Sequence, residues 1–113
     1  MRNKYDIQEE SARILADAII LQAALDYRAA LGRYKRSLEA LEDLQKMSKL
    51  NHAPKAAIKE RIKDAQARIN GAKAEAETLE RFFFSKWGQT LAGDLNGGYI
   101  VRKIRKECGI NGI

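Results

Sequence analysis

The segment DLNGGYIVRKIRK at residues 94–106 gathers residue types that bind anions. Asn96, Gly97 and Gly98 would place flexible backbone N–H groups at the start of a helix, where the helix dipole is positive. Arg102 follows about one turn later, and a guanidinium recognises phosphate through two parallel hydrogen bonds. The segment therefore predicts an anion site at a glycine turn.

Further cations and two aromatic rings occur close to this turn in the sequence. Tyr99 and Trp87 offer flat faces on which a nucleotide base can stack. The other candidate ligands are all basic: Arg81, Lys86, Lys103, Arg105 and Lys106. Two plainer interpretations compete, because Asn-Gly-Gly is also a common turn and Trp87 has the spacing of a core residue. A phosphorylated ligand or an ordinary solvated basic face both fit this pattern.

Residues for catalysis or metal binding do not assemble in the sequence. His52 has no cysteine or carboxylate at the spacing of a metal ligand. No glycine loop of the G-x-x-x-x-G-K-[ST] type is present, and Cys108 is expected to be a small residue on an apolar helix face. The sequence predicts a protein that is not an enzyme and has neither cofactor nor metal.

Two long helices must position the candidate site. Good helix formers dominate residues 5–50 and 54–84, and Asn51 and Pro54 mark the only strong break between them. Apolar residues recur in both segments at alternating steps of three and four, which is typical of a coiled coil. The fold class is therefore all-α, with a long antiparallel helical hairpin over residues 5–50 and 54–84.

The apolar seams of the two helices match each other in an antiparallel register. Facing positions have numbers that sum to 103, and large residues oppose small ones, as with Tyr27 and Ala76 or Leu31 and Ala72. Gly32 and Gly71 also sum to 103. A mid-helix glycine costs about 1 kcal/mol relative to alanine. We therefore expect a close approach of the two backbones there or, alternatively, a groove for a ligand or partner.

Residues 85–113 are expected to form a small helical module on the open end of the hairpin, within one domain of residues 1–113. Ser85 suits the N-cap of a short helix over residues 86–92, and a further helix is predicted over residues 98–108. Its apolar side should dock on apolar residues of the first helix that the hairpin leaves uncovered. These are Ile14, Leu15, Ala18, Ile19, Leu21 and Leu25. A second copy of the chain is the other candidate to cover them, so a homo-oligomer is expected.

Composition favours anionic partners. The 113 residues include 21 Lys and Arg against 15 Asp and Glu, which gives a net charge of +6 and a pI near 9.6. The single cysteine excludes an intramolecular disulfide, and no secretory leader is recognisable. The most apolar run, at residues 14–25, is shorter than the roughly 20 residues of a membrane span. A cytoplasmic protein without a membrane partner is expected.

One stretch near the C-terminus resembles a known group of proteins. RFFFSKWGQTLAGDLNGGYIVRKIRKE, at residues 81–107, is similar to the C-terminal part of small helical proteins of phages and prophages of Gram-positive bacteria. In these proteins a RFFxSxW stretch precedes a GxYxxRKIR stretch. The resemblance implies a viral origin and a location in the cytoplasm of an infected or lysogenic host, and it implies no mechanism.

Three functions fit these features. The first is an anti-defence sponge that sequesters a phosphorylated nucleotide, such as a cyclic nucleotide immune signal. The second is a nucleic-acid-binding protein, although acids are interleaved with the cations in RYKRSLEALEDLQK at residues 33–46. The third is a helical inhibitor or adaptor that binds a host protein through Gly32 and Gly71 or through the uncovered apolar face.

Overall fold

The computed structural model describes residues 4–50 and 55–110, and all regular structure in these residues is α-helical. The helices are α1 (Lys4–Ser48), α2 (Lys55–Phe84), α3 (Lys86–Ala92) and α4 (Gly97–Cys108). The predicted all-α architecture is confirmed, whereas the predicted break at residues 51–54 lies outside the described residues. None of the described helices combines the length and apolar character that crossing a membrane requires.

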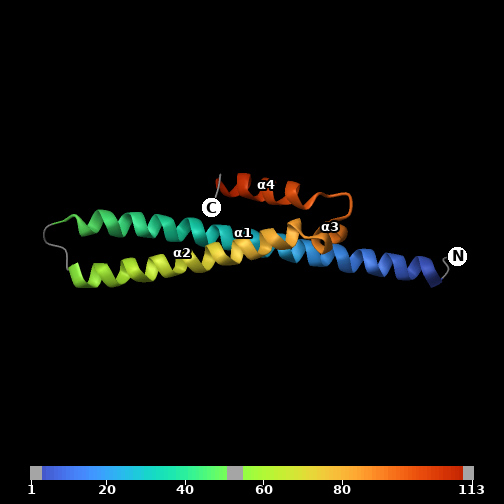
Figure 1. Ribbon diagram of the computed structural model, residues 1–113, viewed down its shortest axis with the longest axis horizontal. Helices are drawn as coiled ribbons and strands as arrows, with labels where there is room; N and C mark the ends of the chain where they lie inside the picture. The colour runs from blue at the N-terminus through green and yellow to red at the C-terminus, as the bar shows by residue number, and fades with distance from the viewer. Residues whose placement is uncertain (1–3, 51–54, 111–113) are drawn as a thin grey trace.

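The molecule is a rod, 77 Å long and 21 Å across in both other directions. α1 and α2 run side by side in opposite directions, and α3 and α4 fold back over the end of α2 (Figure 1). α4 runs in the same direction as α1. The N-terminal end of α1 extends past α3, beyond the rest of the molecule (Figure 1).

Buried residues occur along the whole length of the predicted hairpin seam. Tyr27, Leu31 and Ala76 have no exposed surface, and Ala72 keeps 5%. Nearer the hairpin loop, the seam residue Leu38 is 39% exposed. Ile58 and Ala65, on the facing helix near the loop, keep only 3% each, so the exposure of Leu38 is local to its position on α1.

Local capping sets the bounds of the two short helices. The side-chain oxygen of Ser85 accepts a hydrogen bond from the backbone N–H of Gly88, as expected for the N-cap of α3. α4 ends at Gly109, which adopts the left-handed conformation with φ of 72°. The N–H groups of Gly109 and Ile110 then bond to the carbonyls of Lys106 and Arg105, the pattern of a Schellman motif.

The main core lies where α4 crosses the hairpin. Tyr27, Leu31 and Phe83 are its largest fully buried side chains, and α4 contributes Val101 and Ile104. The ring of Phe83 packs edge-on against Phe82 at 5.5 Å and tilted against Tyr27 at 6.2 Å, measured between ring centres. α4 is therefore held by apolar contacts with both long helices.

The predicted docking position of α4 is wrong. Its apolar side does not cover the spare residues of α1, because Ile14, Leu15, Leu21 and Leu25 remain 69%, 61%, 60% and 52% exposed. At about 100° per residue, these side chains point away from the face of α1 that carries Tyr27. α4 packs instead against the enclosed face, where Phe83 completes the core.

Candidate functional site

Arg105 is part of a polar network that joins α1, α2 and α4. Its Nε lies 2.9 Å from the Tyr27 hydroxyl oxygen and 2.9 Å from Oε1 of Glu80, and its Nη2 also pairs with Glu80. Tyr27 donates to Glu80 at 2.5 Å. The carboxylate therefore accepts hydrogen bonds from two other helices within a partly buried site.

The protonation of this network follows from its burial. Desolvation, and then the hydrogen bond to Glu80, raise the pKa of Tyr27 far above its ordinary value. Burial alone would lower the pKa of Arg105, but hydrogen bonds to Tyr27 and Glu80 outweigh it and raise the pKa. Arg105 is therefore charged, and its guanidinium pairs with Glu80 and Tyr27 of the same chain. The sequence had instead predicted that Arg105 binds an external anion.

The glycine turn before α4 is closed by its own cap. Oδ1 of Asn96 accepts a hydrogen bond from the N–H of Gly98 at 2.7 Å, and both Gly97 and Gly98 are buried. A Cβ at Gly97 would lie 2.0 Å from the carbonyl oxygen of Phe83, and one at Gly98 would lie 3.1 Å from the ring of Phe84. These glycines let α4 approach the end of α2, so the Gly98 N–H is not available to an anion.

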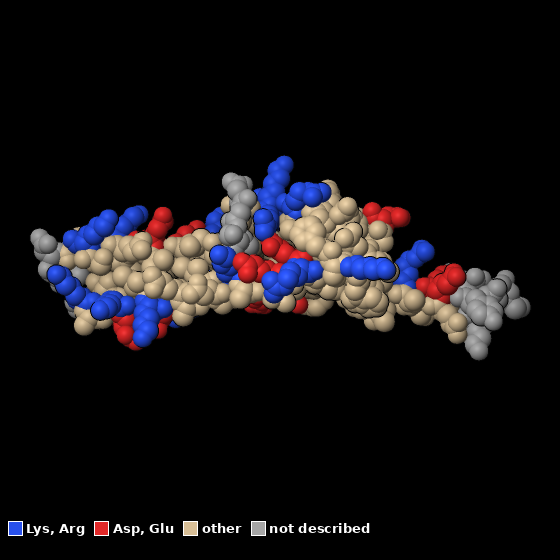
Figure 2. Space-filling model, in the orientation of Figure 1, with Lys and Arg blue, Asp and Glu red and all other residues tan. Residues whose placement is uncertain are grey.

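The outer face of α4 brings four predicted ligands together. Tyr99, Arg102, Lys103 and Lys106 line one open hollow of about 600 Å³, with Glu107 at its rim. The ammonium group of Lys103 lies 6.0 Å from the centre of the Tyr99 ring, within the range of a cation–π contact. In Figure 2, basic side chains stand out from the side of the molecule on which Figure 1 places α4. We call these four residues the outer α4 face.

The charge of the outer α4 face is not cancelled within the described residues. Glu107, the acid at the rim, pairs with Arg28 of α1. Neither Arg102 nor Lys106 has a carboxylate partner among the residues that the structure describes. An anion would therefore meet three cations that have no carboxylate partner among the described residues.

The remaining predicted ligands lie elsewhere. Arg81 bonds to the hydroxyl of Thr78 at 3.1 Å and lines a different hollow with Glu77 and Glu80. Lys86 and Trp87 are exposed on α3, and Trp87 keeps 62% of its surface. Trp87 is thus not the core residue that its spacing suggested, because the enclosed side of this short helix is occupied by Gly88.

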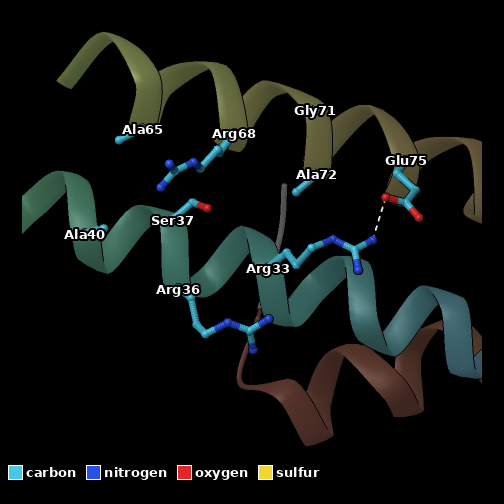
Figure 3. A pocket seen from close by; sticks show the side chains of 9 residues that line it. All are labelled: Arg33, Arg36, Ser37, Ala40, Ala65, Arg68, Gly71, Ala72 and Glu75. Carbon is cyan, nitrogen blue, oxygen red and sulfur yellow. Dashed lines mark hydrogen bonds and ion pairs between the residues drawn. The ribbon is translucent and has the colours of Figure 1, made fainter. Parts of the chain in front are cut away.

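A second basic hollow lies midway along the hairpin and includes Gly71, one of the two glycines at which the sequence predicted a close approach or a groove. It has a volume of about 530 Å³ and is lined by Arg33, Arg36, Ser37, Ala40, Ala65, Arg68, Gly71, Ala72 and Glu75. Arg33 reaches across to Glu75 at 2.5 Å, and Arg68 points toward Ser37, whereas Arg36 points away along α1 (Figure 3). The hollow therefore has a floor of small residues and an open basic edge.

The predicted close approach of backbones at Gly32 and Gly71 is not observed. A Cβ at Gly71 would meet nothing within 4 Å, and one at Gly32 would meet only the side chain of Arg36. Gly71 instead lines an open hollow, and the alternative interpretation, a groove for a ligand or partner, stays a prediction. Sequence reasoning missed Arg36 and Arg68 as lining residues of this hollow. The antiparallel register carries the signal, because their numbers sum to 104, one more than the seam pairs.

Residues with metal-binding or nucleophilic side chains do not gather in the part of the chain that the structure describes. No group of three His, Cys, Asp or Glu residues is placed to hold a metal ion among these residues. Cys108 is half-buried and packs against the core cluster. His52 lies outside the described residues.

Comparisons of the chain with known protein families, with curated proteins and with solved structures find no match.

Proposed function

We propose that this chain is a non-enzymatic binding protein that takes a phosphorylated nucleotide on the outer α4 face. The observation that supports it is the grouping of Arg102, Lys103 and Lys106 around one hollow with the Tyr99 ring. Arg102 supplies the planar fork that pairs with phosphate oxygens, and the two lysines supply mobile point charges. Tyr99, which is 49% exposed, offers the surface for a base.

The anchoring of α4 also supports a binding role. Arg105 ties the helix to Tyr27 and Glu80, and Glu107 ties it to Arg28, so the helix that carries the three cations is anchored to both long helices. A preorganised site loses less conformational entropy when its ligand binds. The hollow of about 600 Å³ is within the usual range of small-molecule sites.

In this proposal the protein acts by sequestering its ligand. Among the residues that the structure describes, the hollow is lined by Tyr99, Arg102, Lys103, Lys106 and Glu107, with no set of nucleophile, base and oxyanion donors, so we expect bound nucleotide to be held and not converted. The resemblance of residues 81–107 to phage proteins makes a cyclic nucleotide of bacterial immunity the ligand class to test first.

Titration calorimetry with a nucleotide panel tests the proposal. The panel contains cyclic dinucleotides and trinucleotides, their linear counterparts, mononucleotides and inorganic phosphate. The double variant Arg102→Ala, Lys106→Ala should weaken binding at least tenfold, which corresponds to about 1.4 kcal/mol. The matched control is Arg61→Ala, Lys63→Ala, which removes the same charge from exposed positions of α2 and should leave the affinity unchanged. Lack of binding to every nucleotide would refute the proposal.

A nucleic-acid backbone is the second candidate ligand, because exposed arginines continue beyond α4. Arg36 and Arg68 have no carboxylate partner among the described residues, and both line the hollow between α1 and α2. Binding to a polyanion should weaken steeply as salt rises and should use both basic regions. Fluorescence anisotropy with a labelled mixed-sequence oligonucleotide distinguishes the two functions: Arg68→Ala should weaken binding only if a nucleic acid is the ligand.

A further inference from the structure

α1 carries a second apolar stripe on the side that faces away from the core. The stripe follows the core positions of a heptad pattern, at alternating steps of four and three. Its members are Ile14, Ala18, Leu21, Leu25 and Gly32, and Arg28 occupies the core position between Leu25 and Gly32. We call these residues the outer α1 stripe. Ile14, Leu21 and Leu25 are 69%, 60% and 52% exposed. From Ile14 to Gly32 the stripe is about 27 Å long at 1.5 Å per residue.

No contact among residues 4–50 and 55–110 accounts for this pattern. α2 and the apolar side of α4 bury the face of α1 that carries Tyr27. α4 reaches the stripe at Arg28, which pairs with Glu107, and beside it Lys35 donates to the Cys108 carbonyl. Gly32 is equally unexplained, because a Cβ there would meet only the flexible end of Arg36 at 3.2 Å. A glycine within a helix lowers its stability. Because close packing within the chain does not require Gly32, we infer that a second molecule packs closely against it.

We propose that a second copy of this chain covers the outer α1 stripe, with the two α1 helices antiparallel. In such a twofold arrangement, core positions pair so that their numbers sum to 46. Leu21 then packs on Leu25 of the second copy, and Leu25 on its Leu21. Ile14 packs on Gly32, and Ala18 faces Arg28.

Side-chain size fits this register. Ile14, the most exposed large residue of the stripe at 69%, meets the one position without a side chain, Gly32. At the flank, Leu15 comes opposite Ala29, so a second exposed leucine also meets a small residue. Pairing of large with small residues is what allows two helices to pack closely without voids.

Charge decides the orientation. A parallel pair would stack Arg28 on Arg28 in the seam and set Gly32 on Gly32, which leaves repulsion and a void. In the antiparallel pair, Asp17 of one copy lies beside Arg28 of the other, because their numbers sum to 45. The Arg28 side chain is 52% exposed beside Glu107, so it is accessible to a second carboxylate.

The mass of the full-length chain in solution tests the proposal. Sedimentation equilibrium across a concentration series should show a dimer. Leu21→Glu and Leu25→Glu should each convert it to a monomer with an unchanged helical circular dichroism spectrum, since both leucines are exposed within one chain. Leu50→Glu is the matched control, because Leu50 is equally exposed at 50% but lies beyond the paired region, and it should remain dimeric.

Thiol cross-linking tests the orientation. In a Cys108→Ser background, Gln22→Cys should be joined to its counterpart by a short bismaleimide, since residue 22 faces residue 22 near the twofold axis. Ile14→Cys should not be joined, because the two sites would be about 27 Å apart. A monomer at all concentrations, a Leu21→Glu variant that stays dimeric, or cross-linking of Ile14→Cys alone would each overturn the proposal.

Discussion

Arg102 and Arg105 are three positions apart on α4, yet their guanidinium groups have opposite surroundings. Arg105 lies against Tyr27 and Glu80, with its side chain 27% exposed. Arg102 is exposed and lines the outer α4 face. The same residue type therefore serves the stability of the fold at one position and is available for binding at the other.

Replacing these two arginines with methionine should separate the two roles. Arg105→Met leaves the Glu80 carboxylate without its cation, so the free energy of unfolding should fall by about 1.5–3 kcal/mol. Arg102→Met removes a solvated charge and should change it by no more than about 0.5 kcal/mol. Urea unfolding followed by circular dichroism measures both. Equal effects would show that the Glu80 network adds little to stability.

The raised pKa of Tyr27 predicts a loss of stability in base. The folded protein holds the hydroxyl proton above the ordinary pKa near 10.0, whereas the unfolded chain releases it there. The contribution of the Tyr27 hydroxyl to the free energy of unfolding is therefore fully present below about pH 10. It declines as pH rises further, by up to about 1.4 kcal/mol per pH unit. In Tyr27→Phe this decline should be absent. Urea unfolding of both proteins on either side of pH 10 checks the difference, and parallel pH profiles would contradict it.

At the scale of elements, each helix is defined by which of its faces is covered. α1 presents one face to α2 and α4 and leaves the outer α1 stripe exposed. α4 buries Val101 and Ile104 and presents its cations outward. The contact of α4 with the end of α2 depends on Gly97, where the backbone of Phe83 occupies the space of a side chain.

Two helical glycines should respond oppositely to alanine. Gly71→Ala places a methyl group in open space, so it should stabilise the protein by about 1 kcal/mol through helix propensity. Gly97→Ala forces α4 away from Phe83 and should destabilise it by about 1–3 kcal/mol. Thermal and urea unfolding report both signs. A destabilised Gly71→Ala variant would indicate that helix propensity does not dominate at this site.

At the scale of the whole molecule, the rod shape determines how two copies fit together. The proposed pairing is centred on residue 23, whereas α1 (Lys4–Ser48) is centred on residue 26. The copies are therefore offset by twice this difference, about 9 Å at 1.5 Å per residue. The dimer would be thicker than one chain but scarcely longer.

Small-angle X-ray scattering should detect this shape. Against a length of 77 Å for one chain, the antiparallel dimer should have a maximum dimension of about 86 Å before side chains and hydration are added. A dimer joined end to end would be nearly twice as long as one chain. The Leu21→Glu variant provides the monomer reference, and a near doubling of length in the wild type would contradict side-by-side pairing.

Much of the fold follows from short-range rules that can be read in the sequence. The three- and four-residue steps of the seam predict the hairpin, and Tyr27, Leu31, Ala72 and Ala76 are buried as that pattern requires. Ser85 caps α3, and α4 begins one residue before its predicted start. These features depend on periodicity and on hydrogen bonds between residues a few positions apart.

The candidate site was only partly predictable. Tyr99, Arg102, Lys103 and Lys106 do form one face, because residues three and four apart on a helix are neighbours. Arg81, Lys86 and Trp87 lie elsewhere, since their positions depend on the directions in which α2 and α3 pack. Pattern alone could not tell the partly buried Arg105 from the exposed Arg102 on the same helix.

Local spacing in the sequence predicted the helical hairpin, the short helix of residues 86–92 and its Ser85 cap, because each depends on residues a few positions apart. Only the tertiary structure decided that α4 packs on the Tyr27 side of α1, leaves the outer α1 stripe exposed and draws Arg105 inward. These outcomes depend on contacts between distant residues, such as the Arg105 hydrogen bond to Tyr27 across 78 positions of the chain. Apolar periodicity marks both faces of α1 alike, and only packing selects the one that the chain itself encloses.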